Sequence, residues 1–142
     1  MVKWREGLPE KKAWKLFKEY VDGYNYAKKD FSAPIPAGIN IRGFDLKIYN
    51  YLNEKHKIKP FFSRRDVIDI LDFCLCWFSF SPDAPPNYKF DTLRDFFGMG
   101  TKGAHEAIID VRQESEVICH FLKTHKKFGE KINWRNSLAT GA

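Results

Sequence analysis

The sequence predicts an α/β fold in which short parallel strands are joined by helical crossovers. Segments with helical spacing of apolar residues alternate with two short apolar segments, 33–40 and 66–70, that are typical of strands. A chain of 142 residues, 44% of them hydrophobic, is long enough to bury a core as one domain. Ligands of parallel sheets bind beyond the carboxyl ends of the strands, so we expect a site at residues 38–45, "GINIRGFD".

The first predicted helix covers residues 8–25. Pro9 suits its first turn, because the missing amide hydrogen costs no helical hydrogen bond there. The strand at 33–40 follows after a loop, and its small apolar residues favour a strand despite two prolines. The apolar face of the helix has spacings of three and four residues, and its predicted members are Ala13, Phe17, Tyr20, Val21 and Tyr24.

A second helix is expected from Phe44 to about Lys55, before the second strand at 66–70. The apolar run at 71–80 is ambiguous by periodicity alone, and we favour a buried helix. The residues of the second helix that are expected to face inward are Phe44, Ile48, Tyr51 and Leu52.

Two further helices complete the predicted fold. The shorter one, at 89–100, has Phe90, Leu93 and Phe97 inward and stops at Gly98, since glycine readily adopts the left-handed conformation that ends helices. The longer one runs from about 104 to 124. Its core stripe is predicted to consist of Ala104, Ile108, Val111, Ser115, Ile118 and Leu122.

Asp45 and Asp110 stand out because each lies at the border of an apolar element. Asp110 precedes Val111 of the core stripe, where a carboxylate costs free energy unless a cation or a metal pairs with it. His105 lies five residues earlier, about 140° around a regular helix, so it reaches the same site only if it precedes the regular helix. Asp45 opens the second helix, where simple capping of free amide groups is an alternative role.

Together these segments resemble the DEDDh family of 3′–5′ exonucleases, relatives of the proofreading subunit of bacterial polymerases. The second motif of that family is similar to residues 37–52, "AGINIRGFDLKIYNYL", and the third to residues 103–122, "GAHEAIIDVRQESEVICHFL". The elements between these motifs have counterparts in order, "DVIDIL" at 66–71 and "KFDTLRDFFGM" at 89–99. The resemblance spans about 30–125, and its style is similar to that of phage-encoded members.

The resemblance implies a ribonuclease H-like fold and hydrolysis of phosphodiester bonds at the 3′ end of a single strand of nucleic acid. It implies that Asp45 and Asp110 bind divalent metal ions, Mg²⁺ or Mn²⁺, which prefer oxygen ligands. Two such ions prepare a water molecule for attack and stabilise charge on the phosphorus oxygens. His105, in the His-x4-Asp spacing, is implied to be the general base.

The family's first motif, Asp-x-Glu on the first strand, supplies the other two carboxylates and has no counterpart before the first helix. Before residue 19 the acidic residues are Glu6 and Glu10, both in polar sequence. We therefore expect the C-terminal part of the fold, with its first three strands missing, and little or no nuclease activity of this chain alone. The unpaired edge of the strand at 33–40 then predicts a complementing N-terminal segment or self-association.

The net charge of +6 favours an anionic partner. We expect a partial exonuclease domain at 1–125 and a basic C-terminal tail at 126–142. The alternative function is a non-catalytic nucleic-acid-binding remnant that uses this tail, with Trp134 on bases; a merely solubilising tail is the simpler interpretation. The candidate nucleic-acid-binding residues are Lys126, Lys127, Lys131 and Arg135.

The composition predicts a cytoplasmic protein that does not enter membranes. The chain has no run of about 18 apolar residues and no secretory signal, and its three cysteines are expected to be buried thiols in a reducing compartment. A zinc site made by Cys119, His120 and His125 is disfavoured, because their spacing matches no standard pairing of ligands. Asp69 and Asp72 flank the end of the second strand, and we interpret them as capping or structural groups.

Overall fold

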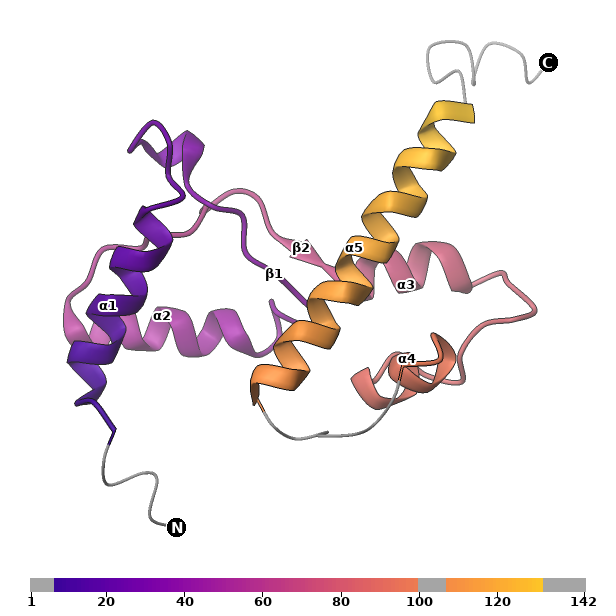
Figure 1. Ribbon diagram of the computed structural model, residues 1–142, viewed down its shortest axis with the longest axis horizontal. Coiled ribbons are helices and arrows are strands. Elements are labelled where there is room, and N and C mark those ends of the chain that lie inside the picture. Colours follow the sequence, from indigo (N-terminus) through magenta and orange to yellow (C-terminus); the bar gives the residue numbers. More distant parts are fainter. Residues whose placement is uncertain (1–6, 100–106, 132–142) are drawn as a thin grey trace. The chain divides into compact units, whose positions relative to one another are not determined.

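The computed structural model describes residues 7–99 and 107–131 (Figure 1). The chain divides into two compact units, Met1–Asp69 and Ile70–Ala142. The described elements are helices and one small parallel sheet, which lies in the first unit. The predicted α/β class is therefore confirmed. None of the helices in the described ranges combines the length and the apolar composition needed to cross a membrane.

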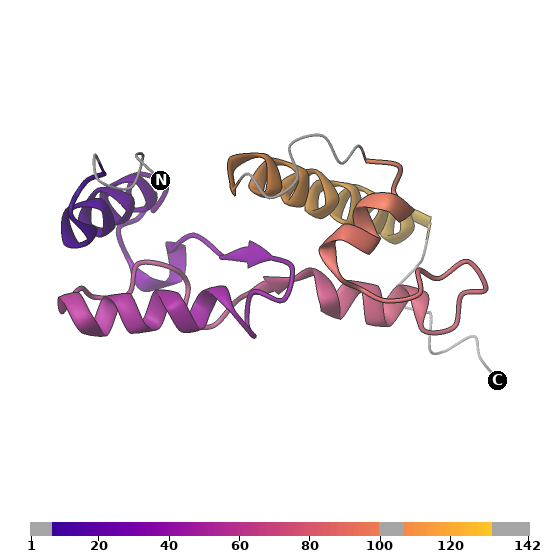
Figure 2. The ribbon, with the colours of Figure 1, turned by 90° about the horizontal axis from the view of Figure 1, so that it is seen from below.

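The first unit is built around one strand–helix–strand crossover. Its elements are α1 (Glu10–Asp22), the 3₁₀ helix η1 (Asp30–Ser32), β1 (Ala37–Gly38), α2 (Asp45–His56) and β2 (Ile68–Asp69). The two strands are parallel, as predicted, and Gly38 pairs with Asp69 (Figure 2). β1 is short because Pro36, just before it, has no amide hydrogen to donate, and Asn40, just after it, turns the chain with a φ of 57°.

Aromatic rings form the core of the first unit. Val21, Tyr49 and Phe61 are buried, and Trp14 and Phe62 are among the partly buried residues that pack against them. The Tyr49 hydroxyl accepts hydrogen bonds from the backbone amides of Phe61 and Phe62, at 2.6 and 3.1 Å. These bonds satisfy two amide groups that burial would otherwise leave without an acceptor, and they hold the chain after α2 against that helix.

The buried face of α2 differs from the predicted one. Tyr49 and Asn53 are buried, whereas Phe44, Ile48 and Tyr51 expose 62, 45 and 59% of their surface. The Asn53 side-chain oxygen accepts a hydrogen bond of 3.0 Å from the indole nitrogen of the core tryptophan. The prediction was wrong because a polar residue, whose side-chain oxygen accepts this bond, occupies a core position that hydrophobic periodicity does not detect.

Helix α1 is present within the predicted range, but of its five expected core residues only Val21 is buried. Ala13 is exposed, and Phe17, Tyr20 and Tyr24 expose 38, 63 and 64% of their surface. The start of α1 is tied to the end of α2, because the Glu10 carboxylate accepts hydrogen bonds from Lys55 at 2.7 Å and from His56 at 2.6 Å. The bond from Lys55, and then that from His56, lowers the pKa of the Glu10 carboxyl group below its ordinary value.

The second unit contains three helices. They are α3 (Ile70–Phe78), α4 (Phe90–Phe96) and α5 (Ala107–Lys131). The apolar run at 71–80 is thus helical, as favoured from its composition, and Gly98 follows α4 with the predicted positive φ, 68°. Phe121 of α5 is buried, and its ring centroid lies 6.0 Å from that of Phe73 and 5.7 Å from that of Trp77. Aromatic contacts therefore hold α5 to α3.

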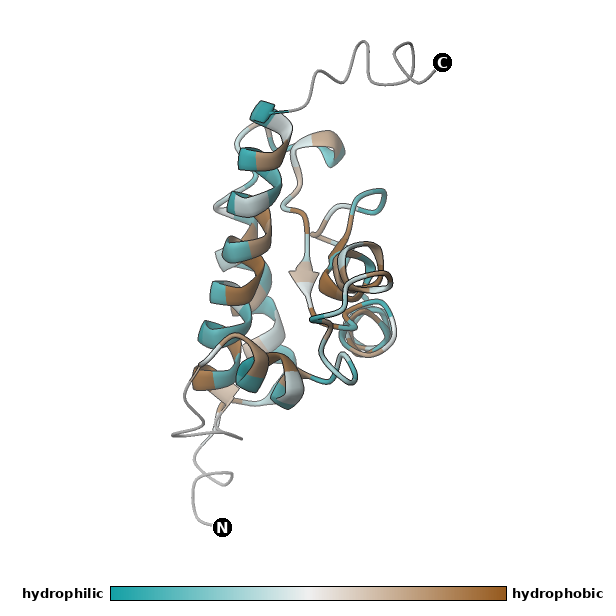
Figure 3. Ribbon diagram, turned by 90° about the vertical axis from the view of Figure 1, so that its right-hand side faces the viewer, coloured by the Kyte–Doolittle hydropathy of each residue, from teal (hydrophilic) through white to brown (hydrophobic). Residues whose placement is uncertain are grey.

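The buried face of α5 also differs from the predicted stripe. Val117 and Phe121 are buried, whereas Ile108 and Val111 each expose 60% of their surface and Leu122 exposes 42%. Hydrophilic and hydrophobic residues are interspersed along this helix (Figure 3). In the first turns of α5, the side that packs against the rest of the unit carries polar residues. The predicted core stripe, which was based on apolar spacing, therefore lies on a different face of the helix.

Candidate functional site

The three residues predicted to form the catalytic centre lie in different parts of the chain. Asp45 is the first residue of α2, in the unit Met1–Asp69. Asp110 belongs to α5, in the unit Ile70–Ala142, and His105 lies outside the described residues. Their predicted convergence therefore stays a prediction, and each described acid is assessed in its own unit.

The turn that leads to Asp45 is held in place by a second carboxylate. Asp69, at the end of β2, exposes only 5% of its surface and accepts hydrogen bonds from the amide groups of Asn40, at 2.9 Å, and Arg42, at 3.2 Å. The Arg42 guanidinium donates a further bond of 3.1 Å to the carbonyl of Val67. The predicted structural role of Asp69 is confirmed, because these bonds fix the loop that connects β1 to α2.

The Asp45 carboxylate is exposed at the amino terminus of α2, and within the described part of the chain it makes no hydrogen bond or ion pair. Capping does not account for it, since Phe44 is the N-cap residue and no side chain caps the helix. The amides of Leu46, Lys47 and Ile48 donate to backbone carbonyls, so it is the helix dipole that favours an anionic side chain at this end. An exposed, unpartnered carboxylate in this position is able to bind a hard cation such as Mg²⁺ or Mn²⁺.

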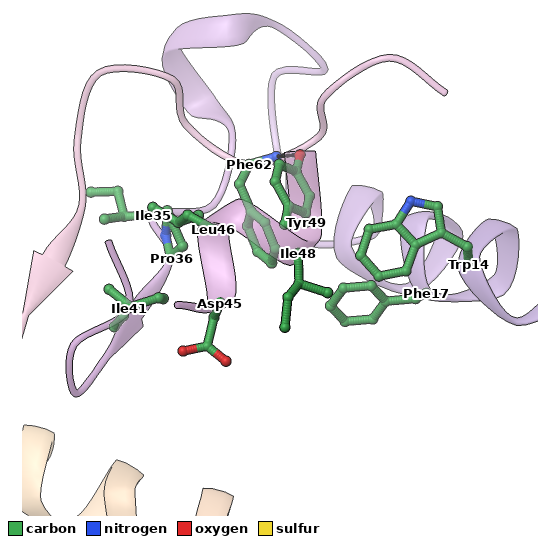
Figure 4. Close-up of a pocket in the computed structure, with 11 residues that line it drawn as sticks. Trp14, Phe17, Ile35, Pro36, Ile41, Asp45, Leu46, Ile48, Tyr49 and Phe62 are labelled. Carbon is green, nitrogen blue, oxygen red and sulfur yellow. Dashed lines mark hydrogen bonds between the residues drawn. The ribbon is translucent and has the colours of Figure 1, made fainter. Parts of the chain in front are cut away.

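A cavity of about 440 Å³ adjoins Asp45, and the acid is one of the residues that line it (Figure 4). Most of the lining is aromatic or aliphatic, with Trp14 and Phe17 from α1 and Ile35 from the segment before β1. The Asp45 carboxylate points away from the Tyr49 ring (Figure 4). The site thus places a charged group at the margin of an apolar hollow, inside a single unit of the chain.

Asp110 has a partner within its own unit. Its carboxylate forms an ion pair with Arg94 of α4, whose side chain is 1% exposed. The same guanidinium lies 3.0 Å from the Asp91 carboxylate and 4.3 Å from the centroid of the Phe90 ring. A buried guanidinium requires such compensation. The sequence predicted a cation or a metal next to Asp110, and the structure places the Arg94 guanidinium there. The residue spacing within α5 contains no information on this partner, because Arg94 belongs to α4.

The two acids fit a divalent cation to different degrees. Asp45 fits as a ligand, because its oxygens are exposed and unpartnered in the described residues. Asp110 fits less well, because Arg94 pairs with one of its oxygens and would repel a second cation. No group of three or more histidine, cysteine, aspartate or glutamate side chains suited to a metal occurs among the described residues.

The residues considered for a zinc site show other contacts. The His125 ring lies 6.3 Å from the Trp77 ring, and the His120 ring lies 5.6 Å from the Phe97 ring, so both imidazoles pack against aromatic groups. Cys119 is exposed, as is Cys76, so the expectation of three buried thiols was wrong; Cys74 alone is buried. The packing of α5 against α3 turns the other two thiols to the surface.

The basic residues near the C-terminus extend the last helix. Lys126, Lys127 and Lys131 are exposed on α5, and Arg135 lies outside the described residues. The beginning of the segment expected to be a tail is therefore helical. Cations suit the last turns of a helix because of its dipole, and they are also positioned to contact phosphate groups.

Comparison with known proteins identifies no relative. No family model, no curated protein and no solved structure matches this chain.

Proposed function

We propose that this protein acts in the metal-dependent 3′–5′ exonucleolytic hydrolysis of nucleic acid. The observation that carries the proposal is the position of Asp45, an exposed and unpartnered carboxylate directly after the loop that follows β1. In parallel α/β sheets, residues at the carboxyl ends of the strands form the usual ligand sites. The hydrogen bonds that the loop amides donate to Asp69 hold the chain before Asp45 in place. Metal ligands require such support from neighbouring groups.

Each residue has a defined role in this proposal. Asp45 would hold a divalent cation, and Asp110, already paired with Arg94, would be the second acidic residue of the centre. His105 accepts the proton of the attacking water, as its near-neutral ordinary pKa allows. When bound, Mg²⁺ or Mn²⁺ supplies an activated water and neutralises charge on the phosphate.

A complementing segment completes the site in this proposal. Two carboxylates are half of the set that a two-metal nuclease of the resembled kind uses, and residues 1–36 contain no Asp-x-Glu sequence. Within the described residues β1 pairs with β2 as its only neighbouring strand, and a strand paired on one edge is a template for an added strand. A partner segment, or a second copy of the chain, would supply that strand.

Metal binding at Asp45 is tested by adding Mn²⁺ to the isotope-labelled protein and recording its NMR spectrum. The paramagnetic ion should broaden the amide signals at the start of α2 in the wild type. The same broadening should occur in the control Asp66→Asn, which changes a carboxylate between α2 and β2. The broadening should disappear in Asp45→Asn. Equal broadening in Asp45→Asn would show that Asp45 is not a ligand.

Hydrolysis is tested with a single strand labelled at its 5′ end, incubated with Mg²⁺ or Mn²⁺ and analysed on a sequencing gel. We expect little or no shortening by this chain alone. Robust shortening that Asp110→Ala abolishes would show that no complementing segment is needed.

The exposed lysines at the end of α5 favour one alternative, a nucleic-acid-binding protein without catalysis. Salt-sensitive binding of DNA that is unchanged in Asp45→Asn, together with no metal binding at Asp45, would support that function instead.

A further inference from the structure

Four aromatic side chains are exposed close together in sequence, at the end of α1 and in the loop after it. Tyr20, Tyr24, Tyr26 and Phe31 expose 63, 64, 84 and 73% of their surface. The rings of Tyr20 and Tyr24 pack edge to face with centroids 5.3 Å apart. Large aromatic groups this exposed contribute little to a core, and a cluster of them is typical of an interaction surface.

Hydrogen bonds close the loop that carries these rings. Ser32 donates to the side-chain oxygen of Asn25, whose side-chain nitrogen donates to the Lys29 carbonyl at 3.2 Å. Asn25 is flanked by Tyr24 and Tyr26, and Ser32 follows Phe31. The Asn25–Ser32 bond therefore brings the two ends of this loop together, and the Lys29 ammonium group lies 5.8 Å from the centroid of the Phe31 ring. A surface that is already ordered loses less conformational entropy on binding.

Basic side chains lie beside this loop. A hollow of about 640 Å³ is lined by Lys18, Lys28 and Lys59 and by two carboxylates, Asp22 and Asp30. Lys18 is paired with Asp22, whereas Lys28 and Lys59 form no ion pair within the described ranges. The three lysines and two aspartates leave the hollow with a net positive charge, which favours an anion there.

We propose that Tyr24, Tyr26 and Phe31 stack with the bases of single-stranded nucleic acid, while Lys28 and Lys59 contact its phosphates. Exposed rings combined with lysines are the features of proteins that bind single strands, because every base has a face that stacks. A duplex keeps its bases stacked on one another and is excluded from such contacts. The ligand is thus an unpaired strand. The binding itself does not require the proposed exonuclease function, but its purpose, to present a strand for hydrolysis, rests on that function.

The test measures fluorescence polarisation of fluorescein-labelled oligo(dT) and oligo(U), without divalent metal and with EDTA present. Tyr24→Ala, Tyr26→Ala and Phe31→Ala should each weaken binding by at least about fivefold, the smallest effect expected when one base loses its stacking partner. Phe80→Ala is the matched control, because Phe80 is 98% exposed in the other unit, and it should bind like the wild type. Circular dichroism verifies that each variant is folded.

The lysines are tested through the salt dependence of binding. Lys28→Gln and Lys59→Gln should each reduce the slope of log affinity against log salt by about 0.7, the value for one phosphate contact with a single strand. Lys47→Gln, an exposed lysine on α2, should leave the slope unchanged.

Several results would overturn the inference: no binding of either strand by the wild type, full affinity in all three aromatic variants, or equal affinity for a duplex. The relative affinities for oligo(dT) and oligo(U) identify DNA or RNA as the preferred strand. Because EDTA excludes metal-dependent chemistry, failure here with metal binding at Asp45 intact would refute this surface alone. Binding lost in the aromatic variants without any metal site at Asp45 would refute the proposed function alone.

Discussion

Replacing Asp69 with alanine should lower the free energy of unfolding of the first unit by about 3–6 kcal/mol. The buried carboxylate accepts two hydrogen bonds, from the amides of Asn40 and Arg42 at 2.9 and 3.2 Å. A hydrogen bond to a charged group contributes about 1.5–3 kcal/mol, and both donors lose their acceptor. Asp69→Asn retains one acceptor oxygen and should cost about 2 kcal/mol. Asp66→Ala is the control. The Asp66 carboxylate lies just before β2 and is more exposed than that of Asp69, so its loss should cost less than about 1 kcal/mol.

Two measurements follow this change. Urea denaturation, monitored by the NMR signals of the first unit, reports the unfolding of that unit. Amide hydrogen exchange reports the loop directly, and the Asn40 and Arg42 amides should exchange faster in Asp69→Ala than in Asp66→Ala. If both variants left these two amides equally protected and the unit equally stable, Asp69 would not organise the loop before α2.

Three other perturbations test the contacts that join the helices. Asp110→Asn should destabilise the second unit by about 2 kcal/mol in urea denaturation, since Arg94 loses a partner; adding Arg94→Met should recover much of this loss, and no recovery would contradict the pairing. Tyr49→Phe leaves two amides without an acceptor and should cost about 1–3 kcal/mol; an unchanged midpoint would exclude that role. The Glu10 pKa is lowered first by Lys55, so stability from this carboxylate is present above its ordinary pKa of 4.5 and lost as the pH falls through the lowered value. The difference in unfolding midpoint between the wild type and Glu10→Gln should therefore vanish in acid, and a difference that persisted there would argue against the ion pair.

Local patterns predicted the order and the type of the elements. The two strands, the crossover helix and the helix at 71–80 occur where the sequence indicated, and Gly98 ends α4 as expected. These features depend on a few neighbouring residues: a proline that limits a strand, a glycine that adopts a positive φ, or a run of apolar residues of helical length.

The faces of the helices required the tertiary structure. Asn53 is buried because Trp14, 39 residues away, donates a hydrogen bond to it, and no spacing within α2 indicates that contact. The packed side of α5 includes Asp110 because Arg94 lies opposite it. Hydrophobic periodicity identifies apolar faces, so it fails where a polar side chain is buried with a partner from another element.

The sequence by itself determined the α/β character of this protein, the positions of its helices and strands, and the acids worth testing. Only the tertiary structure decided that Asp69 orders a loop, that Arg94 pairs with Asp110 and that Asp45 stands without a partner among the described residues. The physical reason is that secondary structure follows from neighbouring residues, whereas the partner of a buried charge depends on residues brought together from distant parts of the chain.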